Sequence, residues 1–279
     1  MQVIVAKKAG FCFGVKRAID ITFNLAKEAK KGVFTYGPLI HNPQVVEELE
    51  QKGIHTIARL SSPDIKTLII RTHGVAPQVY ADTEKMGYNV IDATCPFVKK
   101  AQIFTKTLRD EKYQVLIIGD ERHPEVQGLT GFAGSDVIVA DSAENLPRVK
   151  KKVGIIVQTT QSFETFRRIV SKVIEQAREV KIYNTICDST VQRVKETREL
   201  AGKVDLMIIV GGKNSANTNQ LVKLSREVCD KVYHIETAGE IDSKWFKGVQ
   251  KVGISGGAST PQWIIDDAAK KIRAISVRR

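Results

Sequence analysis

The segment 89–97, NVIDATCPF, decides the fold because it joins a strand, a cysteine and a helix within a few residues. The β-branched run at 89–93 predicts a strand, and Pro96 suits the first position of a helix that starts directly after Cys95. A helix N-terminus stabilises a thiolate and any anionic group attached to it. The segment therefore predicts a strand whose end presents a cysteine as a ligand.

The same arrangement recurs at two other cysteines. The run 181–186, KIYNTI, leads into Cys187 and a helix, and Cys12 lies between the run 3–6 and the first long helix. Cutting the chain after each cysteine gives three segments of roughly 80 to 90 residues with a similar order of predicted elements. The first two segments close with a strand that leads to the next cysteine. The third ends without one, which leaves the strand at 3–6 to complete it.

Short β-branched runs alternate with amphipathic helices along the whole chain, which is typical of parallel α/β sheets. Strands are predicted at 3–6, 33–36, 67–71, 89–93, 114–119, 136–140, 153–158, 181–186, 205–210, 231–235 and 251–255. Helices are predicted at 15–31, 43–52, 76–86, 96–111, 162–178, 191–201, 215–228 and 261–275.

The predicted fold class is α/β: three similar lobes with mostly parallel sheets, in a pseudo-three-fold ring around a central iron–sulfur cluster. The expected domains are 14–96 for the first lobe, 97–188 for the second, and 189–279 plus 1–13 for the third. If the lobes face inward, the loops after their strands meet at one cavity, because ligands bind beyond the carboxyl ends of parallel strands.

Composition narrows the class of protein. The 279 residues are 42% apolar and 27% charged, which is ordinary for a soluble protein. We find no apolar run long enough to cross a membrane and no signal-peptide pattern at the start, so we expect a cytoplasmic protein without a membrane partner. Four cysteines without a local pair do not suggest a secreted disulfide framework.

The net charge of +12 has three interpretations. It could be a solvated basic surface, an attraction to acidic substrates or an acidic protein partner, or a nucleic-acid interface. The basic residues are spread over many helices, and aromatic residues make up only 6% of the chain, so stacking platforms are scarce. We therefore expect no nucleic-acid partner.

The three strand-end cysteines also have three interpretations: isolated buried thiols, a zinc site, or a shared iron–sulfur cluster. Structural zinc prefers locally paired ligands, whereas cluster ligands can come from distant loops, so we favour a cluster held by Cys12, Cys95 and Cys187. Three thiolates on a four-iron cluster leave one iron open, which suits reductive removal of a hydroxyl group. Cys229, predicted to lie within a helix, is assigned no chemistry.

Polar side chains gather after the predicted strands. The loops carry His41, His73, His123, Glu125, Thr159, Thr160, Ser215, Asn217 and Ser259. A single histidine is more often structural than functional, and this interpretation is applied to His55 and His234, which lie inside strand-like runs. The three loop histidines are candidate ligand-binding groups and proton donors.

Glu125 and two glycine-rich loops complete the candidate site. Near an anionic cluster the pKa of Glu125 should rise, which suits a proton donor, although a carboxylate in the first turn of a helix would also be explained by the dipole. The loops 211–219, GGKNSANTN, and 256–261, GGASTP, each open a helix and offer backbone N–H groups to an anion. Neither matches the nucleotide-binding GxxxxGK[ST] loop, so together they favour a phosphate or diphosphate.

These residues together resemble the 4-hydroxy-3-methylbut-2-enyl diphosphate reductase family of the non-mevalonate isoprenoid pathway. The matching segments, in chain order, are AGFCFGVKRAI (9–19), GPLIHNPQVV (37–46), RTHGV (71–75), IDATCPFV (91–98), GDERHPEVQG (119–128), QTT (158–160), NTICDST (184–190), GGKNSANTN (211–219) and GISGGASTP (253–261). One departure is visible: Ala216 stands where the family's serine-rich loop has a second serine, so one donor to the diphosphate is missing.

The resemblance implies one [4Fe–4S] cluster on Cys12, Cys95 and Cys187, and reduction of the allylic alcohol to isopentenyl and dimethylallyl diphosphates. It implies catalytic roles for Glu125, His123 and Thr159. The implied substrate-binding residues are His41, His73, His123, Thr159, Thr190, Ser215, Asn217 and Ser259. The implied partners are the allylic diphosphate and an electron donor such as ferredoxin or flavodoxin, and we expect a monomer or a homodimer. Two rivals stay open, a hydro-lyase that uses the cluster without redox chemistry and an iron–sulfur sensor that binds nucleic acid.

Overall fold

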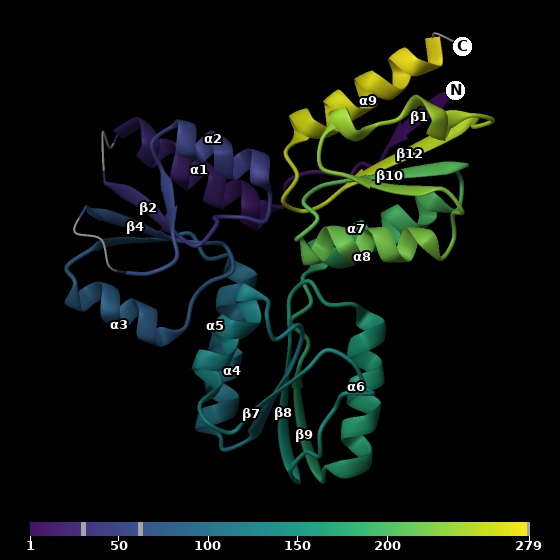
Figure 1. Cartoon of the computed structure of the whole chain (residues 1–279). Helices are drawn as coiled ribbons and strands as arrows, with labels where there is room; N and C mark the ends of the chain where they lie inside the picture. Colours follow the sequence, from purple (N-terminus) through teal and green to yellow (C-terminus); the bar gives the residue numbers. More distant parts are fainter. Residues whose placement is uncertain (29–31, 61–63, 278–279) are drawn as a thin grey trace. The chain divides into compact units, whose positions relative to one another are not determined.

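The structure, a computed structural model, describes residues 1–28, 32–60 and 64–277. Within them, strands and helices alternate in chain order (Figure 1). The elements are β1 (Gln2–Val5), α1 (Phe13–Glu28), β2 (Val33–Tyr36), α2 (Pro43–Gln51), β3 (His55–Ile57), β4 (Thr67–Ile70), α3 (Pro77–Lys85), β5 (Asn89–Asp92), α4 (Pro96–Asp110), β6 (Gln114–Ile118), α5 (Pro124–Ala133), β7 (Val137–Ala140), β8 (Lys152–Val157), α6 (Phe163–Gln176), β9 (Glu179–Tyr183), α7 (Asp188–Ala201), β10 (Leu206–Val210), α8 (Ala216–Arg226), β11 (Val232–Ile235), η1 (Ala238–Glu240), η2 (Ser243–Phe246), β12 (Lys251–Gly256) and α9 (Gln262–Val277).

The described strands form three four-stranded sheets, and every pairing in them is parallel. The strand orders are β3-β2-β4-β5, β7-β6-β8-β9 and β11-β10-β12-β1. All three sheets follow one topology. When the strands are counted as β2 to β5, β6 to β9, and β10 to β12 followed by β1, the second strand of each sheet lies at one edge and the fourth at the other. In the third sheet the N-terminal strand β1 takes the place of the fourth strand, beside β12. The prediction of three parallel α/β lobes is confirmed, whereas their ring arrangement stays a prediction.

The chain divides into two compact units. Unit 1 comprises Met1–Lys16, His41–Val45 and Asp188–Arg279, and unit 2 comprises Arg17–Ile40 and Val46–Cys187. Unit 1 contains the sheet of β1, β10, β11 and β12. Unit 2 contains the other two sheets. The predicted lobe boundaries stay a prediction.

In unit 1 the strand β10 shows how the sheet is covered on both faces. Leu206, Ile208 and Val210 face α9, while Met207 and Ile209 face α7 and α8, so all five side chains are buried. Alternate side chains of a strand point to opposite faces, and a parallel sheet covered on both faces is apolar throughout. This explains the uninterrupted apolar run of β10.

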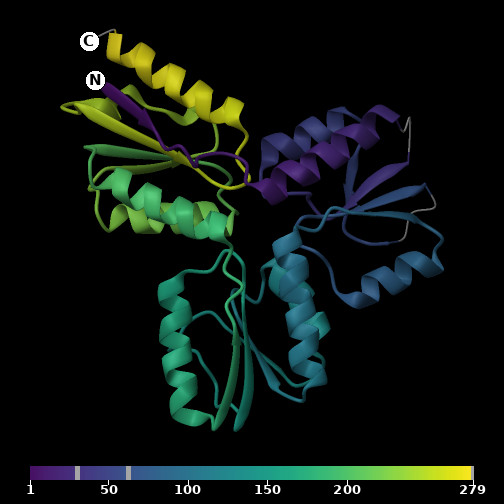
Figure 2. The same cartoon turned by 180° about the vertical axis from the view of Figure 1, so that it is seen from behind.

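In unit 2 the sheet of β6 to β9 lies between α6 on one face and α4 with α5 on the other, as both views show (Figures 1 and 2). Leu116 and Ile118 of β6 pack against α6, and Val115 and Ile117 pack against α4 and α5. The carboxyl end of each strand is thereby fixed, which positions the loops that follow.

The structure corrects three details of the predicted elements. Helix α5 and strand β3 were missing from the predicted set. Cys229 does not lie within a helix, because α8 ends at Arg226, and its buried thiol instead contacts the carbonyls of Val204 and Lys231. The predicted end of the first helix at 29–31 lies outside the described residues.

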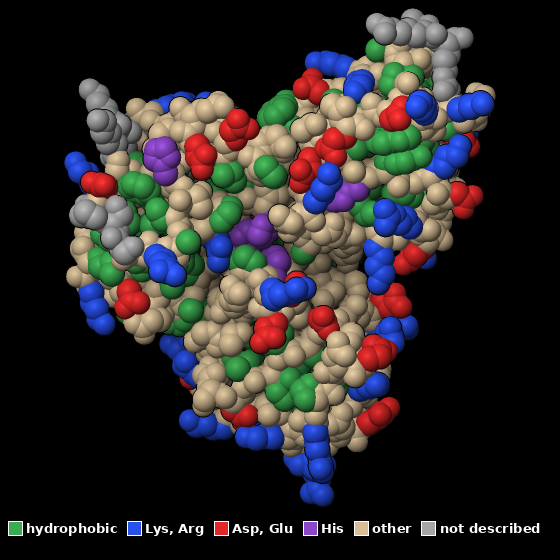
Figure 3. All heavy atoms as spheres, in the orientation of Figure 1, with side chains coloured by type: hydrophobic (Ala, Val, Ile, Leu, Met, Phe, Trp, Pro, Cys, Tyr) green, Lys and Arg blue, Asp and Glu red, His purple; other side chains and the backbone are tan. Residues whose placement is uncertain are grey.

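Surface charge follows the prediction of a dispersed pattern. On the face that Figure 3 shows, the described Lys and Arg side chains alternate with Asp and Glu and do not gather into one stripe. In the described part of the chain, no helix is both long and apolar enough to cross a membrane.

Candidate functional site: three thiols and a buried acid

The three strand-end cysteines are anchored by the same backbone hydrogen bond. Each cysteine N–H donates to the carbonyl of the residue that lies two positions after the third strand of its own sheet. The bonds join Cys12 to Ala258 at 3.1 Å, Cys95 to Thr72 at 3.0 Å and Cys187 to Thr159 at 3.0 Å. The identical geometry follows from the shared sheet topology, so three distant parts of the sequence present a thiol in one way.

The thiols suit a metal cluster. None of the three forms a disulfide within the described chain, each is half-buried, and each directly precedes a helix. The carbonyls of Cys12 and Cys95 each accept an N–H bond four residues on, from Lys16 and Lys99 at 2.9 Å, which places the thiols at the positive end of the helix. The thiolate is the form of cysteine that binds metals.

A network that sequence analysis missed holds the Cys95 loop. Asp92, at the end of β5, accepts hydrogen bonds from Thr94 N and from Tyr80 Oη, both at 2.9 Å, and forms an ion pair with Lys99. Burial alone would raise the pKa of Asp92, but the hydrogen bonds from Lys99 and the other donors lower it below its usual value. The charged pair therefore ties β5 to the first turn of α4, on both sides of Cys95.

The acid of the site is Glu125, the second residue of α5, whose side chain is only 2% exposed. Its Oε1 accepts Thr159 N at 2.6 Å, and its Oε2 accepts Thr159 Oγ1 at 2.7 Å. Burial raises the pKa of Glu125 to about 7, and the two hydrogen bonds from Thr159 lower it only in part. A carboxyl group with this pKa can give up a proton near neutral pH.

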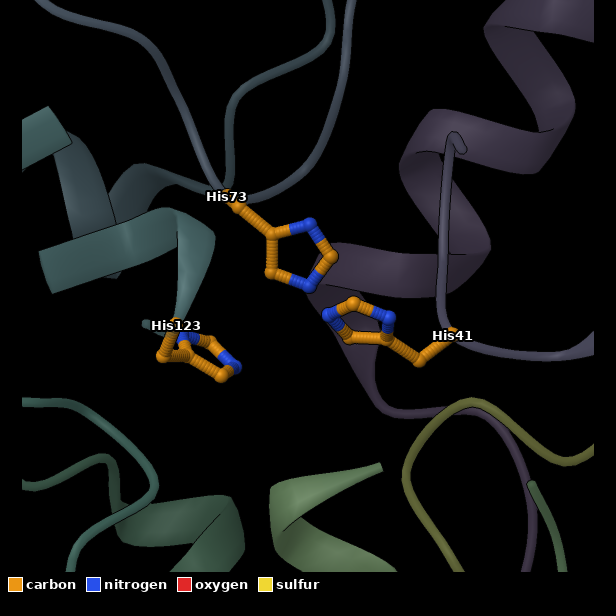
Figure 4. Close-up of side chains that lie close together, drawn as sticks. All are labelled: His41, His73 and His123. Atoms are coloured by element: carbon orange, nitrogen blue, oxygen red, sulfur yellow. The ribbon is translucent and has the colours of Figure 1, made fainter. Parts of the chain in front are cut away.

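His123 is the N-cap of α5 and is bound to the same acid. Its Nδ1 accepts the backbone N–H of Glu125 at 3.2 Å, so the neutral ring carries its proton on Nε2. The His73 ring meets the His123 ring edge to face with 5.4 Å between centroids, and a nitrogen of each ring lies within 4.8 Å of the other (Figure 4). Unit 2 thus brings together two histidines and the acid.

Glycines explain why α5 can lie so close to the His73 loop. A Cβ at Gly131 would collide with the Cβ of Ala76, three residues after His73. Gly131, which weakens the helical pattern of 124–133, is therefore needed for close packing. This tertiary requirement hid α5 from a pattern-based prediction.

His41, which Figure 4 also draws, follows β2 and is grouped with unit 1. Its carbonyl accepts Ser259 Oγ at 3.2 Å. A Cβ at Gly212 would lie 2.6 Å from the same oxygen, so only glycine permits this approach. The His41 backbone is thus held by the two glycine-rich loops of unit 1.

The remaining predicted donors of unit 1 lie at helix starts. Ser215 caps α8 by accepting Thr218 N at 3.3 Å, and Thr190 is buried in the first turn of α7. Asn217 is 4% exposed, and its Oδ1 accepts Ala258 N at 2.9 Å. In the described part of the chain, its Nδ2 has no hydrogen-bond partner, which leaves a buried N–H donor available to a ligand.

Lys213, the cation of the 211–219 loop, is held by two glutamates of the protein. Its Nζ donates to Glu240 Oε2 at 2.9 Å, which raises the pKa of Lys213, and its backbone N–H donates to Glu236. An anion at the start of α8 would therefore meet hydroxyl, amide and backbone donors.

The geometry defines a parallel α/β protein with three thiols that can act as metal ligands and a buried acid beside histidines. Neutral hydrogen-bond donors at helix starts can bind an anion. The family model described as LytB protein matches residues 3–273. The chain therefore belongs to the LytB protein family. The family predicted from the sequence is confirmed, and so is the prediction that the protein is an oxidoreductase.

Curated relatives and solved structures agree with this family. The chain is 48% identical over 278 residues to 4-hydroxy-3-methylbut-2-enyl diphosphate reductase of Pelobacter propionicus, covering 99% of both proteins. It is 48% identical over 279 residues to the protein of the same name from Geobacter sp. strain M21, covering 99% of this chain and 98% of that one.

Two solved structures have a similar fold. One is described as (E)-4-hydroxy-3-methyl-but-2-enyl diphosphate reductase, the terminal enzyme of the non-mevalonate pathway, with 42% identity and a TM-score of 0.73 over 98% of this chain and 100% of that one. The other is the E-1-hydroxy-2-methyl-but-2-enyl-4-diphosphate reductase of Plasmodium falciparum, with 28% identity and a TM-score of 0.89 over 96% of this chain and 87% of that one.

Proposed function

We propose that this chain reduces 4-hydroxy-3-methylbut-2-enyl diphosphate to isopentenyl and dimethylallyl diphosphates in the cytoplasm, as the last step of the non-mevalonate pathway. The names of its relatives support the substrate. The observation that carries the proposal is the buried Glu125, whose pKa of about 7 suits protonation of a leaving hydroxyl group.

Cys12, Cys95 and Cys187 would hold one [4Fe–4S] cluster. Their half-buried thiols, which directly precede helices, fit that role, whereas Cys229 is buried in the core of unit 1 and does not. When bound, such a cluster supplies electrons and an iron with an open coordination position.

The candidate donors to the diphosphate are neutral groups in each of the two units. Unit 1 offers Ser215, Asn217 and Ser259, and Asn217 Nδ2 is a buried donor without a hydrogen-bond partner among the described residues. Unit 2 offers His73 and the Nε2–H of His123, and His41 and Thr190 complete the set. Ala216 contributes no hydroxyl, but it is the first residue of α8, where a backbone N–H is available.

Glu125 would deliver the proton that turns the hydroxyl group into water. Thr159 orients both oxygens of the acid, and His123 fixes its backbone, so the three act as one catalytic group. The overall reaction consumes two electrons and two protons, breaks the allylic C–O bond, forms one C–H bond and releases one water. The electrons would come from a ferredoxin or a flavodoxin.

The test is anaerobic turnover of the reconstituted protein with the allylic diphosphate and dithionite-reduced methyl viologen. We expect both diphosphate products, with two electrons consumed per product molecule. A hydro-lyase would give product without the viologen, and a nucleic-acid sensor would give none while binding DNA in a salt-dependent way. Either result would overturn the proposal.

A further inference from the structure

One surface of unit 2 combines exposed apolar, aromatic and basic side chains. We call it the α4–β9 surface, and it consists of Phe97, Lys100, Ile103, Phe104, Lys181 and Tyr183. Its centre is a stack of Phe104 on Tyr183, with 4.1 Å between the ring centroids and nearly parallel planes. This stack joins α4 to the edge strand β9.

Basic side chains lie over the two stacked rings. Lys100 Nζ is 5.6 Å from the Phe104 centroid, and Lys181 Nζ is 5.5 Å from the Tyr183 centroid. Lys181 is paired with Glu111, whereas Lys100, exposed on α4, forms no ion pair within the described chain. The surface therefore has unneutralised positive charge along α4.

Two apolar side chains of α4 face solvent beside these lysines. Ile103 is 63% exposed and Phe97 is 40% exposed. Lys100 lies midway between them, three residues from each. Residues three apart on a helix are neighbours, so Phe97, Lys100 and Ile103 lie on one side of α4. Exposed aromatic and apolar anchors with a basic rim are typical of protein interfaces rather than of a solvated helix face.

Both elements of the α4–β9 surface lead directly to proposed cluster ligands. α4 starts at Pro96, immediately after Cys95, and β9 ends at Tyr183, four residues before Cys187. A redox partner bound here would contact the helix that begins directly after Cys95 and the strand that leads toward Cys187. Electron transfer becomes steeply slower with distance, so a docking surface next to the ligands is favoured.

We propose that the α4–β9 surface is the docking site of an acidic one-electron carrier protein. The inference rests on the proposed function, because it requires a cluster that must be reduced. Two reduced carriers would each donate one electron per turnover and leave oxidised by one electron. Positive charge on α4, and the chain's net charge of +12, complement an acidic carrier.

The test compares a double variant of this surface with a matched control on the opposite face of the same sheet. The variant is Lys100→Glu with Ile103→Ser. The control is Lys172→Glu with Ile174→Ser on α6, where Ile174 is 60% exposed. Because these side chains are exposed, we expect both variants to unfold at the same denaturant concentration as the wild type.

Binding of a purified acidic [2Fe–2S] ferredoxin is measured by calorimetry at low salt, with turnover driven in parallel by reduced ferredoxin and by reduced methyl viologen. We expect the α4 variant to weaken ferredoxin binding about tenfold or more and to slow ferredoxin-driven turnover, with viologen-driven turnover unchanged. The α6 control should match the wild type in all three measurements.

Three results would overturn the docking proposal: unchanged ferredoxin binding in the α4 variant, an equal loss in the α6 control, or an equal loss with ferredoxin and with viologen. A change in oligomeric state of the α4 variant without a change in ferredoxin binding would assign the surface to self-association instead. Failure of the proposed function would look different, because the wild type itself would then give no product with viologen.

Discussion

Glu125 of unit 2 and Asn217 of unit 1 occupy the same place in two sheets of identical topology. Each is the second residue of the helix that follows the first strand of its set, and each is almost fully buried. Each accepts the backbone N–H of the residue two positions after the third strand, Thr159 for Glu125 and Ala258 for Asn217. One scaffold thus holds a carboxyl group in one lobe and an amide in another.

The difference between these two side chains separates two tasks. A carboxyl group at this buried position has a pKa of about 7 and can deliver a proton. A carboxylate would repel a diphosphate, whereas the amide presents a neutral N–H donor with no protein partner in the described chain. In the proposed function, Glu125 of unit 2 would supply the proton and Asn217 of unit 1 would help to bind the anion.

The largest expected effect is the loss of the cluster in Cys95→Ser. This change should abolish the iron content and visible absorption of the reconstituted protein while leaving the Glu125 and Asn217 pairs intact. Cys229→Ser is the matched control, because Cys229 lies in the core of unit 1 and should leave the cluster unchanged. Iron and absorption that persist in Cys95→Ser would show that Cys95 is not a ligand.

Glu125→Gln should lower turnover by two to four decades, on the order of the contribution of general acid catalysis. Glutamine still accepts the Thr159 N–H but cannot deliver the proton, so substrate affinity should change little. Steady-state kinetics measure the loss of turnover, and calorimetric binding of the allylic diphosphate measures the substrate affinity. Turnover near the wild-type value would remove Glu125 from the mechanism.

Burial of Glu125 should make stability depend on pH. Between its ordinary value of 4.5 and about 7 the folded protein holds a proton that the unfolded chain releases. The free energy of unfolding of the cluster-free protein should therefore fall by roughly 3 kcal/mol as pH rises through this window. Denaturant titrations of wild type and Glu125→Gln at pH 5 and pH 8 measure it, and the same pH dependence in both proteins would contradict the account.

Asn217→Asp tests the other member of the pair. Aspartate keeps an acceptor for Ala258 N but replaces the Nδ2 donor with a negative charge, so diphosphate affinity should fall about tenfold or more. kcat should change less than the dissociation constant measured by calorimetry. A variant that lost turnover but kept its affinity would reverse the division of tasks between the two units.

The smallest expected effect is that of Thr159→Val. It removes the hydroxyl bond that lowers the pKa of Glu125, so that pKa should rise further and the alkaline limb of the pH–rate profile should move to higher pH. Turnover at neutral pH should fall only a few-fold, since the backbone bond stays. Thr159→Ser should keep the wild-type pH–rate profile. If the alkaline limb does not move in Thr159→Val, the Thr159 hydroxyl does not affect the pKa of Glu125.

The parallel α/β fold and the strand-end cysteines were predictable from sequence because the signals are local. A β-branched run before Cys95 and Pro96 after it are enough to fix a strand–thiol–helix order. Helix α5 was not predictable, because Gly131 serves packing against Ala76 rather than helix propensity. The Asp92–Lys99 pair was missed for a similar reason, since its partners become neighbours only in the folded lobe.

The candidate site divides in the same way. The sequence predicted Glu125 as an acid whose pKa an anionic cluster would raise, and the structure adds a second cause, burial, that the sequence did not show. The equivalence of Glu125 and Asn217 could not be predicted, because it depends on strand order and on which backbone N–H each side chain meets.

The most direct test of the central claim is a Mössbauer spectrum of the anaerobically reconstituted protein, recorded with and without the allylic diphosphate. The account predicts four irons, of which one is distinct, and a shift of that one alone when the substrate is added. Four equivalent irons, or a spectrum that the substrate leaves unchanged, would contradict a three-cysteine cluster with an open iron at the reaction site.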